Sequence, residues 1–174
     1  MKALTLWQPW ASLIAWGEKQ YETRSWTTNY RGPLAIHASL RFTSAQNTIC
    51  WQQPFATALI RHGLEHPSQL TLGCVLCVAD LVDIVRTDVV EVCEQERAFG
   101  DYTPGRFAWK LEHIRVLGDN EVAVAGHQGL WDWPVAMDTL RLRRLARSDR
   151  PSSIRRASIV IASSGRGKRL RNAL

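Results

Sequence analysis

The sequence has no run of about 18 apolar residues, the length that a membrane-spanning helix requires. Its first ten residues, MKALTLWQPW, are also unlike a signal peptide, because the apolar stretch is short and is interrupted by polar residues. These absences predict a cytoplasmic protein without a membrane partner. In that compartment the four cysteines, Cys50, Cys74, Cys77 and Cys93, are expected to be thiols.

The sequence also lacks the motifs of nucleotide-phosphate binding, of metal binding and of a Ser/His/Asp catalytic triad. Neither a Walker A motif nor a G-x-G-x-x-G motif occurs. Cys74 and Cys77 have the C-x-x-C spacing, but no second C-x-x-C completes a four-ligand set, and residues three apart on a strand face opposite sides. The histidines are scattered, so spacing alone assembles no Ser/His/Asp arrangement. We therefore expect no metal and no cofactor.

Charge is distributed unevenly along the chain. Residues 141–174 contain eleven Lys and Arg but one acid, whereas residues 1–140 contain fifteen acids and eleven bases. Such asymmetry predicts a nucleic-acid-seeking extension on a separate folded body, with a merely solubilising extension as the alternative. Residues 65–121 are acidic, with eleven acids and five bases. A nucleic-acid track is therefore expected to be restricted to a cleft and the extension.

The order of apolar patterns predicts an α+β fold with five or six strands and two or three short helices. No regular βαβ alternation occurs, so a small mixed or antiparallel barrel with helices on one side fits better than a parallel sheet. Pro9 and Gly17 are expected to bound the first helix, and Pro54 to interrupt the second. The expected strands are 2–6, 32–39, 72–85, 106–117 and one within 121–131, with a further candidate at 158–164; the expected helices are 9–16, 44–62, one between 88 and 100, and a basic one at 137–147.

The stretch GEKQYETRSW brings a lysine, a glutamate and an arginine close together. If it is extended, Glu22, Arg24 and Trp26 share one face, and Lys19 can approach Glu22 from the end of the preceding helix. The spacing predicts a Glu22–Arg24 ion pair. At a surface such a pair contributes only about 0–1 kcal/mol, so spacing alone does not make the stretch a site.

The motifs on either side of this stretch indicate that it belongs to a larger pattern. The segment LTLWQPWASLIAWGEKQYETRSWTTNYRGPLAIHAS resembles the start of the ASCH domain in its QPWA helix opening, its GxKxxExR signature and its RGPLxIHA strand. LGCVLCVADLVDI, FAWKLE and GLWDWP resemble later strands of that family, so the resemblance covers roughly residues 2–134. It implies a PUA-like β-barrel domain at residues 2–136, followed by a basic extension at 137–174.

The resemblance also implies a ligand-binding cleft. Lys19, Glu22 and Arg24 are expected to line it, with Gln8, Trp10, Trp26 and Arg31 nearby, since these residues lie in the matched motifs. The implied partner is RNA, single-stranded nucleic acid or a nucleoside-like small molecule. Lysine and arginine would contact phosphates or base edges, and tryptophan would stack on bases.

Catalysis is an alternative within the same family. Some ASCH-like proteins are amidohydrolases of acetylated cytidine, with a lysine, a threonine three residues later and a glutamate on the central strand. Lys19 matches the lysine, Glu22 replaces the threonine, and Asp80 is the nearest central-strand carboxylate. Lys19 and Glu22 are thus the candidate catalytic groups of an amidohydrolase or a nuclease. A protein-interaction module that docks through its acidic surface or its extension is the third possibility.

Overall fold

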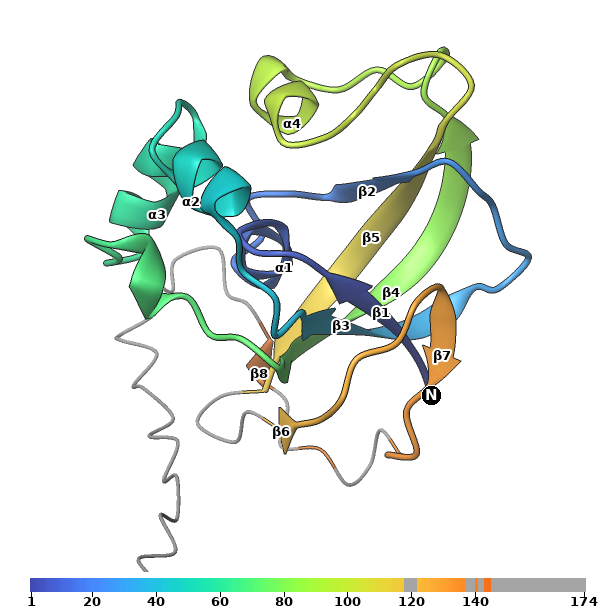
Figure 1. The fold of residues 1–174 in the computed structure, drawn as a ribbon. Coiled ribbons are helices and arrows are strands. Elements are labelled where there is room, and N and C mark those ends of the chain that lie inside the picture. The colour runs from blue at the N-terminus through green and yellow to red at the C-terminus, as the bar shows by residue number, and fades with distance from the viewer. Residues whose placement is uncertain (118–121, 137–139, 141–142, 145–174) are drawn as a thin grey trace, which may run out of the picture.

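The computed structural model describes residues 1–117, 122–136, 140 and 143–144. Eight strands and four α-helices alternate irregularly along this part of the chain, with one short 3-10 helix (Figure 1). In chain order the elements are β1 (Lys2–Leu6), α1 (Trp10–Ala15), β2 (Tyr21–Arg24), β3 (Gly32–Ala38), α2 (Ser44–Cys50), α3 (Phe55–Arg61), η1 (Pro67–Gln69), β4 (Cys74–Arg86), α4 (Glu94–Ala98), β5 (Phe107–Val116), β6 (Val122–Ala123), β7 (Leu130–Asp132) and β8 (Arg143–Arg144).

The strands form one curved, mixed sheet. Six of them follow the order β2-β5-β4-β3-β1-β7, while β6 pairs with β4 and β8 pairs with β5. The β1–β3 pair is parallel and the other pairs are antiparallel. The short helices lie against this half-barrel (Figure 1). The structure therefore confirms an α+β fold with one small mixed sheet and short helices, as the sequence predicts.

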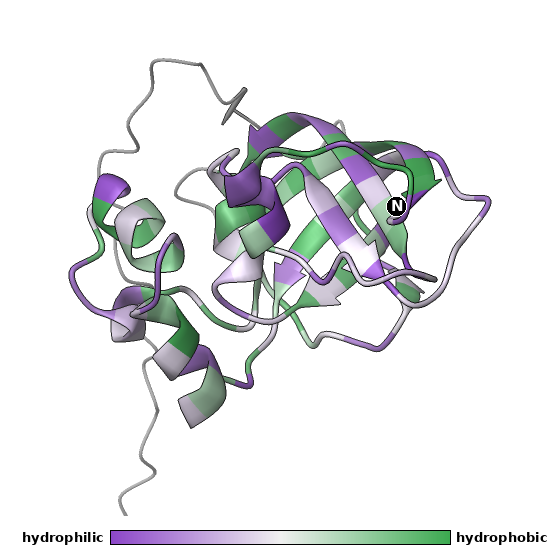
Figure 2. Cartoon of the chain, turned by 90° about the horizontal axis from the view of Figure 1, so that it is seen from above, coloured by the Kyte–Doolittle hydropathy of each residue, from purple (hydrophilic) through white to green (hydrophobic). Residues whose placement is uncertain are grey.

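Apolar side chains pack on both faces of the sheet. On one face Leu4, Ile36 and Leu81 pack around Ile14 of α1. On the other face Val75 and Val78 of β4 pack with aromatic residues that follow β6, including Trp131. This double burial explains why the first half of β4 is apolar on both sides. β3 is likewise buried from Leu34 to Ala38, and the strands of the sheet carry both hydrophobic and hydrophilic residues (Figure 2).

The first helices begin and end where the sequence predicts. Pro9 precedes α1, and Gly17 follows it with a φ of 75°, a left-handed conformation that glycine adopts without steric cost. The predicted 44–62 helix is split at Pro54 into α2 and α3. Leu13 and Trp16 of the α1 region pack with Cys50, Phe55 and other apolar residues of α2 and α3, forming a second core beside the sheet.

Two predictions are wrong in detail. Asp88 does not begin α4, because its carboxylate pairs with Arg86 Nε at 3.0 Å; the helix begins at Glu94, with Cys93 at its N-cap. The predicted basic helix at 137–147 is contradicted at Arg143–Arg144, which form β8 against the end of β5. The rest of that helix and the candidate strand at 158–164 lie outside the described residues.

No helix in the described ranges is both long and apolar enough to cross a membrane. Within those ranges there is also no cluster of three or more His, Cys, Asp or Glu residues that could hold a metal ion. Cys74 and Cys77 are buried free thiols, and burial raises the pKa of the Cys77 thiol.

Candidate functional site

A pocket of about 480 Å³ lies between the half-barrel and the helices. Its volume is in the range of sites that hold small molecules. The wall is built from the start of α1, from β2, from the α2–α3 region and from the segment after α4. The lining residues are Trp10, Glu22, Thr23, Ile49, Gln52, Phe55, Ala98, Phe99, Gly100, Asp101 and Arg106.

Aromatic rings form one side of this pocket. Trp10 meets Phe55 edge-on with ring centroids 5.9 Å apart, and Phe55 meets Phe99 at 4.9 Å. The three rings come from α1, α3 and the end of α4, so tertiary packing brings them together. Phe99 is fully buried and Phe55 is nearly so, whereas Trp10 is half-buried, so Trp10 is the ring of this wall that a flat ligand can contact most.

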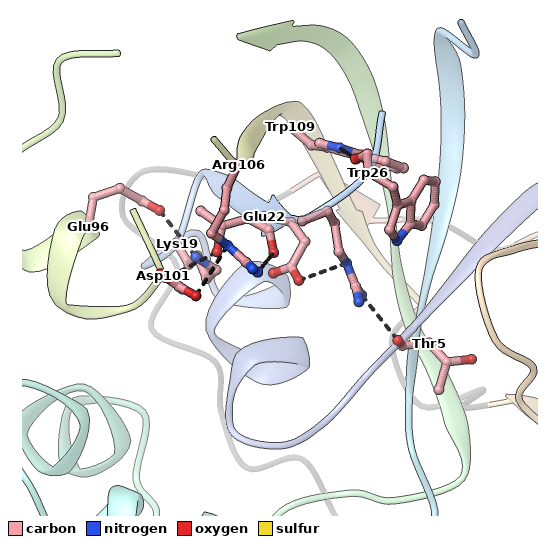
Figure 3. A network of polar contacts seen from close by, with 10 residues as sticks. Thr5, Lys19, Glu22, Trp26, Glu96, Asp101, Arg106 and Trp109 are labelled. Carbon is pink, nitrogen blue, oxygen red and sulfur yellow. Dashed lines mark hydrogen bonds and ion pairs between the residues drawn. The ribbon is translucent and has the colours of Figure 1, made fainter. Parts of the chain in front are cut away.

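Glu22 forms part of the opposing polar side. Its side chain is 11% exposed, and its Oε1 lies 3.2 Å from Arg24 Nε (Figure 3). Arg24 Nη2 in turn donates to the carbonyl oxygen of Thr5 at 3.4 Å. The ion pair predicted from strand spacing is thus present, and it fixes a carboxylate in the wall of the pocket.

Arg106 and Asp101 complete the polar side. Arg106 Nε lies 3.2 Å from Asp101 Oδ2, and Arg106 Nη2 donates to the carbonyl oxygen of Thr23 at 3.5 Å. Hydrogen bonds from the Thr103 side chain and backbone lower the pKa of Asp101, which is therefore ionised at neutral pH. The ionisable lining residues are two carboxylates and one guanidinium. Sequence reasoning missed Arg106 because it lies in an acidic segment, just before the FAWKLE strand and outside the GxKxxExR stretch that suggested the site.

Lys19 lies behind the pocket wall. Its side chain is fully buried, and Nζ is 3.5 Å from Glu96 Oε1 (Figure 3). A Cβ atom on Gly100, which lines the pocket, would lie 3.3 Å from Lys19 Nζ. The ammonium group therefore lies next to the pocket-lining Gly100 without lining the pocket itself.

Glu96 is the centre of a buried network. Its carboxylate accepts hydrogen bonds from the backbone N–H groups of Gln20 and Tyr21, at 2.7 and 3.1 Å, and from the hydroxyl of Tyr102 at 3.2 Å. Burial and the adjacent Glu96 raise the pKa of the Tyr102 hydroxyl. These contacts attach α4 to the segment between α1 and β2. Glu96 is 77 residues from Lys19, so no local pattern pointed to it.

Besides Lys19, four predicted residues are not among those that line the pocket: Gln8, Arg24, Trp26 and Arg31. Gln8 is buried, and its Nε2 donates to Ser12 Oγ and the Thr71 carbonyl oxygen, which anchors the start of α1. Trp26 packs edge-on against Trp109 at 4.7 Å. Arg31 donates to the carbonyl oxygens of Thr28 and Tyr30 on the surface.

Asp80 on β4 is occupied elsewhere. Both of its carboxylate oxygens accept hydrogen bonds from Arg115, and His113 Nδ1 lies 3.1 Å from Oδ2. Burial raises the pKa of Asp80, but Arg115 and His113 outweigh that effect and hold it below its usual range. Asp80 is not among the pocket-lining residues, so Glu22 and Asp101 are the carboxylates available to a ligand there.

Comparison with known proteins identifies the family of the chain. The family model of the ASCH domain matches residues 4–120. Human and mouse proteins named activating signal cointegrator 1 are each 40% identical over 82 residues, which is 46% of this chain but 14% of each relative. A ZmASCH mutant protein from Zymomonas mobilis has a similar crystal structure, with 16% identity, a TM-score of 0.39, and coverage of 71% of this chain and 75% of that one. Because the family model matches more than half of the chain, this protein belongs to the ASCH domain family.

Proposed function

We propose that this protein binds RNA or single-stranded nucleic acid and holds one base in the pocket beside β2. Membership of the ASCH family, which is associated with nucleic-acid binding, supports the ligand class. The observation that carries the proposal is the pairing of an aromatic wall with the fixed carboxylate of Glu22. A base presents a flat face to the first and a polar edge to the second.

The charges of the pocket favour a base over a phosphate. Glu22 and Asp101 contribute two negative charges against the single positive charge of Arg106. A phosphate would be repelled by this set, whereas a base edge that carries N–H groups can donate to Glu22. Cytosine presents such a donor at its exocyclic amino group, which glutamate is known to accept in nucleic-acid recognition.

The phosphates would lie outside the pocket. The Arg24 side chain is 25% exposed and is paired with the pocket residue Glu22, which keeps its guanidinium close to the pocket. The eleven basic residues of 141–174 add sequence-independent attraction. This division predicts affinity that falls with salt, because each phosphate contact releases counterions, while the base contacts depend little on salt.

Fluorescence anisotropy with a labelled single-stranded RNA and its DNA counterpart tests the proposal across a salt series. We expect binding at low salt that weakens as salt rises, and a several-fold loss for Arg24→Ala. Arg31→Ala is the matched control, since Arg31 is an arginine of the same motifs that is not paired with a pocket residue and contacts the Thr28 and Tyr30 carbonyl oxygens instead. Absence of binding to either probe at low salt would refute the proposal.

Hydrolysis of an N-acylated cytidine is the second candidate. The position of Glu22 in the pocket favours it, because a fixed carboxylate can act as a general base. Glu22 would take a proton from water, whose oxygen adds to the acyl carbon. The carbon–nitrogen bond then breaks, and the proton passes to the leaving nitrogen, giving cytidine and a carboxylate.

Release of acetate from N4-acetylcytidine measures this activity. We expect turnover by the wild-type protein and a loss of at least about a hundredfold in Glu22→Gln, the usual scale for removal of a general base. A wild-type protein that binds the compound without releasing acetate has the binding function alone.

A further inference from the structure

The surface next to the pocket carries an exposed aromatic residue that the pocket does not use. Trp7 is 46% exposed, and the guanidinium of Arg41 lies over its ring at 5.8 Å from the centroid. Arg41 is itself exposed, and no carboxylate of the described residues is ion-paired with it. A large exposed ring beside an uncompensated cation is the combination that binds single-stranded nucleic acid.

The backbone connects this pair to the pocket. Trp7 precedes the pocket residue Trp10 by three positions, and the carbonyl oxygen of Trp7 accepts a hydrogen bond from Ala11 N–H at 3.3 Å, so Trp7 begins the turn that leads into α1. Ser39 N–H donates to the Leu6 carbonyl oxygen at 2.7 Å, which brings the segment containing Arg41 to the end of β1.

Arg24 connects the pocket residue Glu22 to the strand that precedes Trp7. Its Nε pairs with Glu22 in the pocket wall, and its Nη2 reaches the carbonyl oxygen of Thr5, near the end of β1 (Figure 3). Thr5 is two residues from Trp7, so the two Cα atoms are at most about 7.6 Å apart. Arg24 therefore links Glu22 to the end of β1, the strand that leads directly to Trp7, and Arg41 lies over the Trp7 ring.

We propose that Trp7 and Arg41 form a second nucleotide subsite. Trp7 stacks on the base next to the one held in the pocket, Arg24 contacts the phosphate between these two bases, and Arg41 contacts the following phosphate. The inference rests on the proposed function, since it requires that the pocket holds a base. It adds that the ligand is a strand of at least two nucleotides rather than a free nucleoside.

Trp51 provides a comparison within the same molecule. It is also an exposed tryptophan, at 54%, but its ring meets His66 edge-on and it lines a small apolar hollow that includes Glu65. Exposure of a tryptophan alone is therefore not the basis for proposing a binding site at Trp7. The adjacent arginines and the link to the pocket distinguish Trp7 from Trp51.

The test measures affinities for cytidine and for a short oligocytidylate RNA with the full chain. Stacking on an aromatic residue is worth about 1–3 kcal/mol per base, so Trp7→Ala should weaken oligocytidylate binding by about 5- to 150-fold. Cytidine binding should stay unchanged, because cytidine occupies the pocket alone. Trp7→Phe should retain most of the affinity, and Trp51→Ala should bind both probes like the wild type.

Arg41→Ala should reduce the magnitude of the slope of log affinity against log salt by about 1, the change expected for loss of one phosphate contact. Cytidine affinity should again be unchanged. Wild-type-like oligocytidylate binding by Trp7→Ala would overturn the second subsite while leaving the pocket proposal intact. A wild-type protein that binds neither probe would overturn both, so the two failures are distinguishable.

Discussion

Lys19 carries the most deeply buried charge in the described part of the site. Its side chain is fully buried and that of Glu96 is 7% exposed, so neither charge has bulk water around it. Charges are tolerated in such an environment only when they are paired and hydrogen-bonded. The carboxylate meets this condition through the backbone of Gln20 and Tyr21 and through Tyr102. This network holds the loop that carries Gly100 and Asp101 against β2.

Removing the ammonium should therefore strongly destabilise the protein. In Lys19→Met the buried Glu96 loses its cation, and the free energy of unfolding should fall by about 3–5 kcal/mol in urea denaturation. Lys2→Met is the control, because Lys2 pairs with Asp132 at an exposed site, where loss of the pair costs about 0–1 kcal/mol. Equal losses in the two variants would show that the Lys19–Glu96 pair has no special structural role.

At the scale of secondary-structure elements, local signals predicted local features well. Pro9 and Gly17 fixed the limits of α1, Pro54 marked the break between α2 and α3, and the alternation at 72–85 located β4. The failures arose where distant contacts compete with local signals. Asp88 resembles a helix cap, yet its carboxylate pairs with Arg86, and the basic segment pairs at Arg143–Arg144 with β5 instead of forming a helix there.

The pocket residues also fall into those that local sequence signals predict and those that depend on distant contacts. Trp10 and Glu22 were predicted because they lie in motifs of a single short stretch. Phe55, Phe99 and Arg106 line the pocket with them, but each comes from a different later element. Their sequence neighbourhoods resemble ordinary core or surface segments. Only the packing of α3, α4 and β5 around β2 brings them together, and no spacing rule encodes that arrangement.

The contacts between elements also predict a pH dependence. Glu18, after α1, accepts hydrogen bonds from Arg61 of α3, and from Gln95 of α4 at 3.0 Å, while His62 Nε2 lies 2.9 Å from it. Burial raises the pKa of Glu18, but these partners outweigh burial and lower it below 4.5. The folded protein thus favours the ionised form, so this stabilisation is fully present above pH 4.5 and is lost as pH falls through the lower folded-state pKa.

Glu18→Gln should therefore reduce stability at neutral pH and flatten the acid limb of the stability–pH profile. Thermal or urea unfolding at a series of pH values from neutral to acid measures both effects. Glu65→Gln is a suitable control, since the Glu65 side chain is exposed and has no ion pair among the described residues. An unchanged acid limb in Glu18→Gln would mean that the carboxylate does not hold α3 and α4 to the end of α1.

At the scale of the whole molecule, the basic extension and the pocket should act separately. Deleting residues 145–174 leaves β8 intact and removes eight basic residues and one acid. We expect weaker binding to a single-stranded RNA and a shallower dependence on salt, because fewer counterions are released. Cytidine affinity should be unaltered. A truncated protein with the full-length salt slope would contradict an electrostatic role for the extension.

The folded body is acidic, so its net charge alone does not attract nucleic acid. Residues 65–121 have an excess of six negative charges, so nucleic acid is favoured only where specific contacts compensate for repulsion. In the binding account these contacts are the stacked base in the pocket, its edge on Glu22 and the phosphate contacts of Arg24. Binding therefore depends on selective recognition of a base and not on net charge.

The most direct test compares the affinities of cytidine and uridine for the wild-type protein and for Glu22→Leu by isothermal titration calorimetry. Cytidine presents an amino donor where uridine presents a carbonyl acceptor. The account predicts that the wild type prefers cytidine by about 5- to 150-fold, the range expected for one good edge contact, and that Glu22→Leu loses this preference. Equal affinities in the wild type, or an undiminished preference in Glu22→Leu, would contradict the claim that Glu22 reads a base in this pocket.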